Sequence, residues 1–138
     1  MFWLATTILG CAQSPTEADK KLATYVEQNI VLPKGSPGPQ CYKRYYQVVE
    51  GAELAELADS LAKSGGRLLI GRYVRPRRHE MPGIVWVSSQ EETPTVYDAG
   101  CGEINVYYIA GETPESISAI CSFDVAGEIP AEVQPFSC

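Results

Sequence analysis

The stretch "GEINVYYIAGETPESISAICSF" (residues 102–123) gives the clearest indication of how this chain folds. Its first part alternates apolar and polar residues, which predicts a strand with one face in a core formed by Ile104, Val106 and Tyr108. The motif "IAGETP" around Gly111 predicts a turn. The last part also fits helical spacing, but the alternation of Ile117, Ala119 and Cys121 favours a second strand. The stretch therefore predicts an antiparallel hairpin.

The cysteines predict that this hairpin is crosslinked. The chain has five cysteines, and setting Cys11 aside leaves an even number, which predicts two disulfides with three alternative connectivities. The four are Cys41, Cys101, Cys121 and Cys138. Strands folded at Gly111 would place the middle two opposite each other, at a separation that a disulfide can span. The pairing of Cys41 with Cys138 then follows by elimination.

The register of this hairpin needs one adjustment. Pairing centred on Gly111 puts Ile104 opposite Ser118, which mismatches the apolar faces of the two strands. A one-residue bulge near Gly102 would correct both the register and the disulfide.

The other elements follow from the same periodicities. Residues 15–31 predict a helix in which Ser14 is the N-cap and Glu17 completes a capping box. The stretch "GAELAELADSLAKSGG" (residues 51–66) has the apolar stripe of a second helix. Aromatic and β-branched residues predict further strands in 41–49, 67–75 and 84–89. The expected fold class is α+β, with two helices packed on an antiparallel sheet of about five strands and stapled by disulfides.

The N-terminus contains an apolar run that ends at a cysteine. Residues 2–9 read "FWLATTIL", which is typical of the apolar middle of a secretory signal. The motif "ILGC" that ends at Cys11 resembles the lipobox of bacterial lipoproteins. The resemblance implies a signal peptide over residues 1–10, a lipid-anchored N-terminus over 11–14, with acyl chains such as palmitate, and a single domain over 15–138.

Two alternatives for the N-terminus remain open. Gly10 and Ala12 also fit a plain signal peptide cut after Ala12, and the run would fit an apolar first strand of a cytosolic protein. Ala12 and Gln13 lack the acidic residue that favours inner-membrane retention. The lipoprotein resemblance therefore implies export to the cell envelope and an outer-membrane anchor that faces the periplasm.

The body of the chain is also similar to a known group. The stretches "KRYYQVV", "GRYVRP" and "YDAGCGEINVYY…ISAICSF" together resemble a group of small exported bacterial proteins with no assigned activity. The resemblance covers roughly residues 30 to 125. It implies the hairpin and the Cys101–Cys121 pairing, and it implies nothing about mechanism.

The charge pattern singles out one segment. The net charge of −6 argues against nucleic-acid binding, which depends on basic groups that meet phosphates. Yet "GRYVRPRRHEMPG" (residues 71–83) concentrates basic residues in the expected hairpin loop between the strands 67–75 and 84–89. Guanidinium groups suit carboxylates and phosphates, so the predicted anion-binding residues are Arg75, Arg77, Arg78 and His79. The alternative is a solvated turn whose arginines pair with neighbouring glutamates.

These features favour a binding or structural module without enzymatic activity. The expected partners are the membrane, through the N-terminal lipid, and an anionic envelope component or protein. No catalytic residue or cofactor is predicted, and no metal site, because no Cys-x-x-Cys pair exists and His79 is the single histidine. The alternatives are a secreted hydrolase of an anionic envelope substrate with His79 as acid/base, and an exported protease inhibitor that presents the disulfide-bound hairpin. The sequence sets no oligomeric state.

Overall fold

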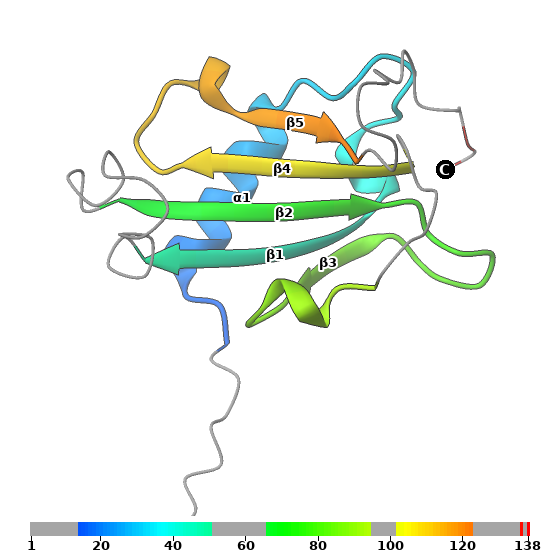
Figure 1. The fold of residues 1–138 in the computed structure, drawn as a ribbon, viewed down its shortest axis with the longest axis horizontal. Helices are drawn as coiled ribbons and strands as arrows, with labels where there is room; N and C mark the ends of the chain where they lie inside the picture. The colour runs from blue at the N-terminus through cyan, green and yellow to red at the C-terminus, as the bar shows by residue number, and fades with distance from the viewer. Residues whose placement is uncertain (1–13, 51–65, 95–101, 123–135, 137) are drawn as a thin grey trace, which may run out of the picture.

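The computed structural model describes residues 14–50, 66–94, 102–122, 136 and 138. The fold class is α+β, as predicted, and the described residues form one α-helix and a five-stranded sheet. The helix is α1 (Glu17–Asn29), and the strands are β1 (Lys43–Glu50), β2 (Arg67–Val74), β3 (Gly83–Trp86), β4 (Glu103–Ile109) and β5 (Ser118–Cys121). Short 3-10 turns in the described part of the chain are η1 (Pro39–Cys41), η2 (Gln90–Glu92) and η4 (Pro114–Ser116). Figure 1 shows the strands side by side, with α1 crossing behind them.

Helix α1 begins two residues later than the sequence predicts. Thr16, and not Ser14, is the N-cap, and its capping box is closed by Asp19 rather than Glu17. Each partner of the box accepts a hydrogen bond from the other's backbone N–H, which satisfies two of the free donors at the helix start. The helix ends at Asn29, and Ile30 is already extended. The predicted second helix falls on residues 51–66, and 51–65 lie outside the described part of the chain.

The sheet is mixed, and not antiparallel as predicted. The strand order is β3-β1-β2-β4-β5, and β3 runs parallel to β1. The expected hairpin between β2 and β3 is therefore wrong, because both edges of β2 are already occupied by β1 and β4. The segment from Arg75 to Pro82 instead passes the start of β1 and delivers β3 to its free edge. Gly83 N–H donates to Tyr42 O at 3.2 Å, where this pairing begins.

The predicted β4–β5 hairpin is present, but its register differs. Ile104 pairs with Cys121 rather than with Ser118, an offset of three residues (121 − 118 = 3). The turn is longer than predicted because η4 is inserted after Gly111. Both Ile104 and Cys121 are buried on the same face of the sheet, so the longer turn matches the two faces without the predicted bulge.

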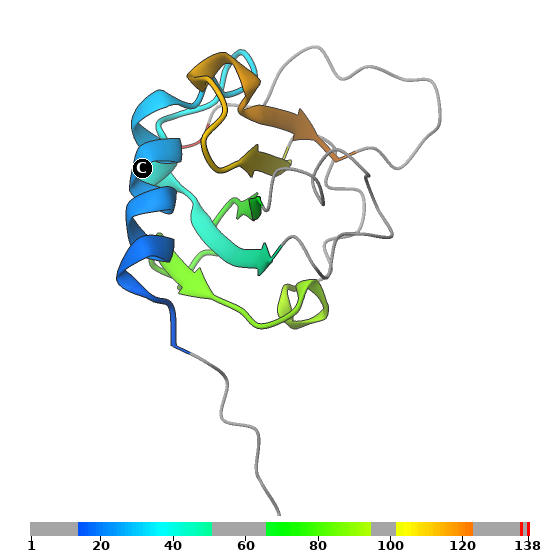
Figure 2. The same cartoon turned by 90° about the vertical axis from the view of Figure 1, so that its left-hand side faces the viewer.

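The core lies between α1 and one face of the sheet, as Figure 2 shows from the side. Three fully buried tyrosines form its centre: Tyr42, Tyr46 and Tyr73. The predicted inward face of β4, formed by Ile104, Val106 and Tyr108, is confirmed. Gly71 lies directly across from Tyr46, and a Cβ there would be 2.8 Å from the tyrosine ring. The ring of Tyr46 in β1 thus occupies the space that a side chain at Gly71 in β2 would need.

Candidate anion-binding site

The four predicted anion-binding residues share one connection. They lie between β2 and β3, at the end of the sheet where β2 stops and β1 and β3 start; this connection is at the right in Figure 1. A 2.9 Å hydrogen bond from Glu80 N–H to Arg77 O closes a tight turn over residues 77–80. All four are exposed: Arg75, Arg77, Arg78 and His79. We call residues 75–82 the arginine loop.

One carboxylate holds the arginine loop to the sheet. Glu80 Oε2 accepts a 2.7 Å hydrogen bond from Lys43 Nζ, and Glu80 Oε1 accepts a 3.1 Å bond from the Arg77 backbone N–H. The Lys43 hydrogen bond, helped by the Arg77 N–H, lowers the pKa of Glu80, and the bond to Glu80 raises the pKa of Lys43. Both groups are therefore held in their charged forms. Glu80, a residue of the loop itself, and Lys43 of β1 therefore fix the geometry of the loop.

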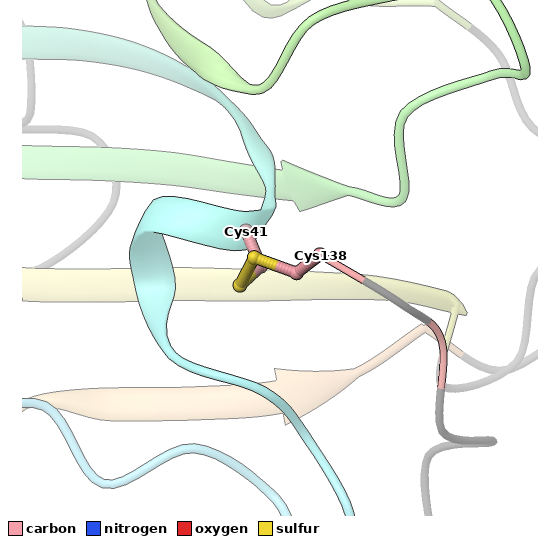
Figure 3. Close-up of a disulfide and its surroundings, with 2 residues drawn as sticks. All are labelled: Cys41 and Cys138. Carbon is pink, nitrogen blue, oxygen red and sulfur yellow. A yellow bond between two sulfur atoms is a disulfide. The ribbon is translucent and has the colours of Figure 1, made fainter.

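The predicted Cys41–Cys138 disulfide lies beside the arginine loop. Figure 3 shows it joining η1 to the C-terminal residue, with a Cα–Cα distance of 5.3 Å. Phe136 packs edge-on against Tyr42 at 5.2 Å between ring centroids. The Arg75 guanidinium lies 4.9 Å from the centroid of the same Phe136 ring, close enough for a cation–π contact. The disulfide thus brings an aromatic platform under the first arginine of the loop.

Cys121 is also disulfide-bonded. Its predicted partner, Cys101, lies outside the described residues, so the Cys101–Cys121 pairing stays a prediction.

Two cavities flank the arginine loop. The lysine-side cavity has a volume of about 330 Å³ and includes Lys43, Tyr45 and Glu92 in its lining. The disulfide-side cavity has a volume of about 290 Å³ and includes Cys41, Phe136 and Cys138. Arg75, Arg77 and Glu80 line both cavities, and Arg78 lines the disulfide-side cavity. His79 lines neither of the two.

The local charge is positive on an acidic protein. Glu80 is engaged by Lys43 and lies 3.9 Å from the Arg77 Nε. Among the described residues, no carboxylate forms an ion pair with Arg75 or Arg78. One Arg–Glu pair of the solvated-turn alternative is thus present, between Arg77 and Glu80, while Arg75 and Arg78 form none with the described carboxylates. The loop retains cationic groups that an external anion can reach.

A second charged cluster, which the sequence analysis missed, is internal. Arg44 in β1 pairs with Glu27 of α1, and the Tyr46 hydroxyl donates to the same carboxylate at 3.0 Å. Tyr46 also shares a short hydrogen bond with Tyr73, and burial raises the pKa of both phenols. The alternation in "KRYYQVV" puts Arg44 on the same face as Tyr46, which could have indicated a buried arginine. This cluster joins helix to sheet.

The described residues hold no group of three or more His, Cys, Asp or Glu side chains placed to bind a metal ion. Within that same part of the chain, no helix has the length and apolar character needed to cross a bilayer. Comparison of the chain with protein families, curated proteins and solved structures finds no match.

Proposed function

We propose that this chain is a small lipid-anchored cell-envelope protein that binds an anionic partner through the arginine loop and has no enzymatic activity. The observation that carries the proposal is the placement of Arg75 and Arg77. Both residues line cavities on the two sides of the loop, and Glu80 is the one described carboxylate that forms an ion pair with either of them.

The chemistry of the loop supports anion binding. Guanidinium groups present planar sets of N–H donors that match carboxylates and phosphates. The backbone of the loop is held by Glu80 and its first arginine by Phe136, so binding need not order the whole segment. An exposed arginine without an acidic partner also has its charge available over the range set by solvent screening, about 8 Å at physiological salt.

Export and anchoring are part of the same proposal. Disulfides are typical of proteins in oxidising compartments, and Cys41, Cys121 and Cys138 are all disulfide-bonded. The lipobox-like motif supplies Cys11 as the acylated residue, and outer-membrane placement facing the periplasm follows from that resemblance. An intact-mass measurement on protein purified from its native membrane tests this part, because acylation at Cys11 adds the mass of the acyl groups. A product that retains Met1 and free thiols would contradict it.

The anion-binding part is tested by replacing Arg75, Arg77 and Arg78 with Gln. The matched control replaces three lysines away from the loop, Lys20, Lys21 and Lys34, and changes the net charge equally. The probes are phosphatidylglycerol vesicles and purified peptidoglycan, each measured by co-sedimentation at low and high salt. We expect the arginine variant to lose retention on at least one probe and the lysine control to keep it. Equal retention by both variants at low salt would overturn the proposal.

The two alternatives receive no specific support. His79 is exposed on the turn and lines neither of these two cavities, and a hydrolase with His79 as acid/base stays a prediction. The turn between β4 and β5 is exposed from Gly111 to Ser116, as a protease inhibitor would need, but exposure alone does not distinguish it from an ordinary turn.

A further inference from the structure

The lysine-side cavity contains a negative group as well as the arginines. Glu92, the last residue of η2, lines it together with Arg75 and Arg77. Glu92 Oε2 accepts hydrogen bonds from the backbone N–H groups of Ser88 and Ser89, as part of a capping box. These bonds fix the carboxylate in place. Its other oxygen, Oε1, accepts no hydrogen bond from the described residues.

The charges of this cavity divide into two poles. Lys43 and Glu80 lie 2.7 Å apart and neutralise each other. This leaves the guanidinium groups of Arg75 and Arg77 as a positive pole and the Glu92 carboxylate as a negative pole. The remaining lining residues are mainly apolar: Tyr45, Val74 and Pro94.

We infer that the lysine-side cavity binds a small zwitterion, such as a free amino acid or a dipeptide with unblocked ends. The ligand carboxylate meets Arg75 and Arg77, and its ammonium group meets Glu92. The inference rests on the proposed anion-binding function and names the class of ligand that the site takes. A ligand with only negative groups can pair with the arginines, but the like charge of Glu92 repels it.

The size of the cavity agrees with a small ligand. A volume of about 330 Å³ is near the lower end of the range for small-molecule sites, roughly 300–1,000 Å³. It accommodates one or two amino-acid residues. A longer chain would have to leave the cavity and lie on the surface, so the two charged ends of the ligand must be close together.

The charge of Glu92 is separable from its structural role. A capping box works equally with glutamine at this position, because the side-chain oxygen that accepts the backbone hydrogen bonds is retained. The variant Glu92→Gln therefore removes the negative pole and leaves the η2 turn intact. Glu91→Gln is the matched control, since Glu91 is the neighbouring residue, is exposed, and does not line the cavity.

The test uses the full chain and three probes in NMR titrations: dialanine, N-acetyl-dialanine and dialanine amide. They carry both charges, only the carboxylate, and only the ammonium. We expect dialanine to bind roughly five-fold more tightly than N-acetyl-dialanine, the effect of one partly exposed ion pair. Glu92→Gln should remove that difference and Glu91→Gln should keep it. Replacing Arg75 and Arg77 with Gln should abolish binding of both carboxylate probes.

The outcomes separate the inference from the proposed function. If dialanine and N-acetyl-dialanine bind equally well, or if Glu92→Gln leaves their difference unchanged, the zwitterion inference is wrong and anion binding stands. If no carboxylate probe binds, or if the arginine variant binds as the unmodified protein does, the cavity is not an anion site and the inference falls with it. Retention on peptidoglycan or phosphatidylglycerol vesicles then decides separately whether the arginine loop binds anions elsewhere.

Discussion

Removing the Cys41–Cys138 crosslink should strongly destabilise the fold. The perturbation is the double variant Cys41→Ala and Cys138→Ala; alanine is chosen because Cys41 is buried and a serine hydroxyl there would lack a partner. The disulfide joins residues 97 positions apart. In the chain-entropy description, releasing a loop of that length stabilises the unfolded state by about 4.7 kcal/mol at 25 °C.

The assay is urea unfolding at equilibrium, followed by the fluorescence of Trp86, which packs at 5.5 Å against the core residue Tyr46. We expect the free energy of unfolding to fall by about 2 to 5 kcal/mol, the range spanned by native disulfides in small domains. Mutation is preferred to chemical reduction, because a reductant would also open the disulfide of Cys121. Phe136→Ala is the control, since it removes the ring beneath Arg75 and keeps the crosslink.

A loss below about 1 kcal/mol would refute this reasoning. It would mean that the C-terminal segment contributes little constraint to the unfolded chain. The disulfide-side cavity gives a second readout in the same protein, because Phe136 and Cys138 line it. The double variant should therefore also weaken retention on anionic probes, and the same retention as the unmodified protein would show that the arginine loop is held independently of the crosslink.

Three further perturbations follow from the packing and the charges. Gly71→Ala should destabilise the protein by about 1–3 kcal/mol in thermal unfolding, because the added methyl group overlaps the buried ring of Tyr46; an unchanged midpoint would contradict that contact. Glu80→Gln should make the free energy of unfolding depend less on pH in the acid range. The lowered pKa of Glu80 means that its contribution is present above about pH 4.3, its unfolded value, and is lost as pH falls through the folded pKa; acid titrations that coincide for both proteins would refute this. Glu27→Leu should cost about 3–5 kcal/mol in urea unfolding, since it leaves Arg44 buried without its partner, and the additional change Arg44→Met should recover much of the loss; no recovery would show that the cost comes from packing.

The sequence predicts the elements that depend on local pattern. Helix α1 and strands β1, β2 and β4 all have apolar residues at the spacing of their own secondary structure, and that spacing needs no knowledge of the partner. The second strand of the hairpin was found in the same way. Its register was missed because the number of residues in the turn depends on η4, which the motif around Gly111 does not specify.

The partner of β3 could not be read from its own residues. A connection of residues 75–82 can close a hairpin or pass the neighbouring strand, since two strand spacings are only about 10 Å. The choice depends on β4, which lies further along the chain and occupies the second edge of β2. An antiparallel neighbour was therefore predicted where the structure has a parallel one.

Only part of the candidate site could likewise be predicted from local sequence. Its arginines lie within four residues of one another, and the cluster of basic residues in residues 71–83 was enough to identify them. The residues that give the site its shape come from three other segments: Lys43 from β1, Glu92 from η2, and Phe136 from the C-terminal segment. No local pattern connects them, and only the topology of the sheet and the disulfide brings them together.

The start of α1 and the arginine loop lie at opposite ends of strand β2. Asp19, in the first turn of the helix, pairs with Arg67 at the start of β2, and the arginine loop follows the last residue of that strand. Eight residues of strand separate these ends by roughly 23 Å at about 3.3 Å per step. That span is more than twice the screening length of about 8 Å at physiological salt, which matters if the chain is anchored through Cys11, as proposed, with the strands perpendicular to the membrane. Solvent ions would then screen the arginines from the charge of the membrane that holds the anchor, and the arginines would face away from that membrane.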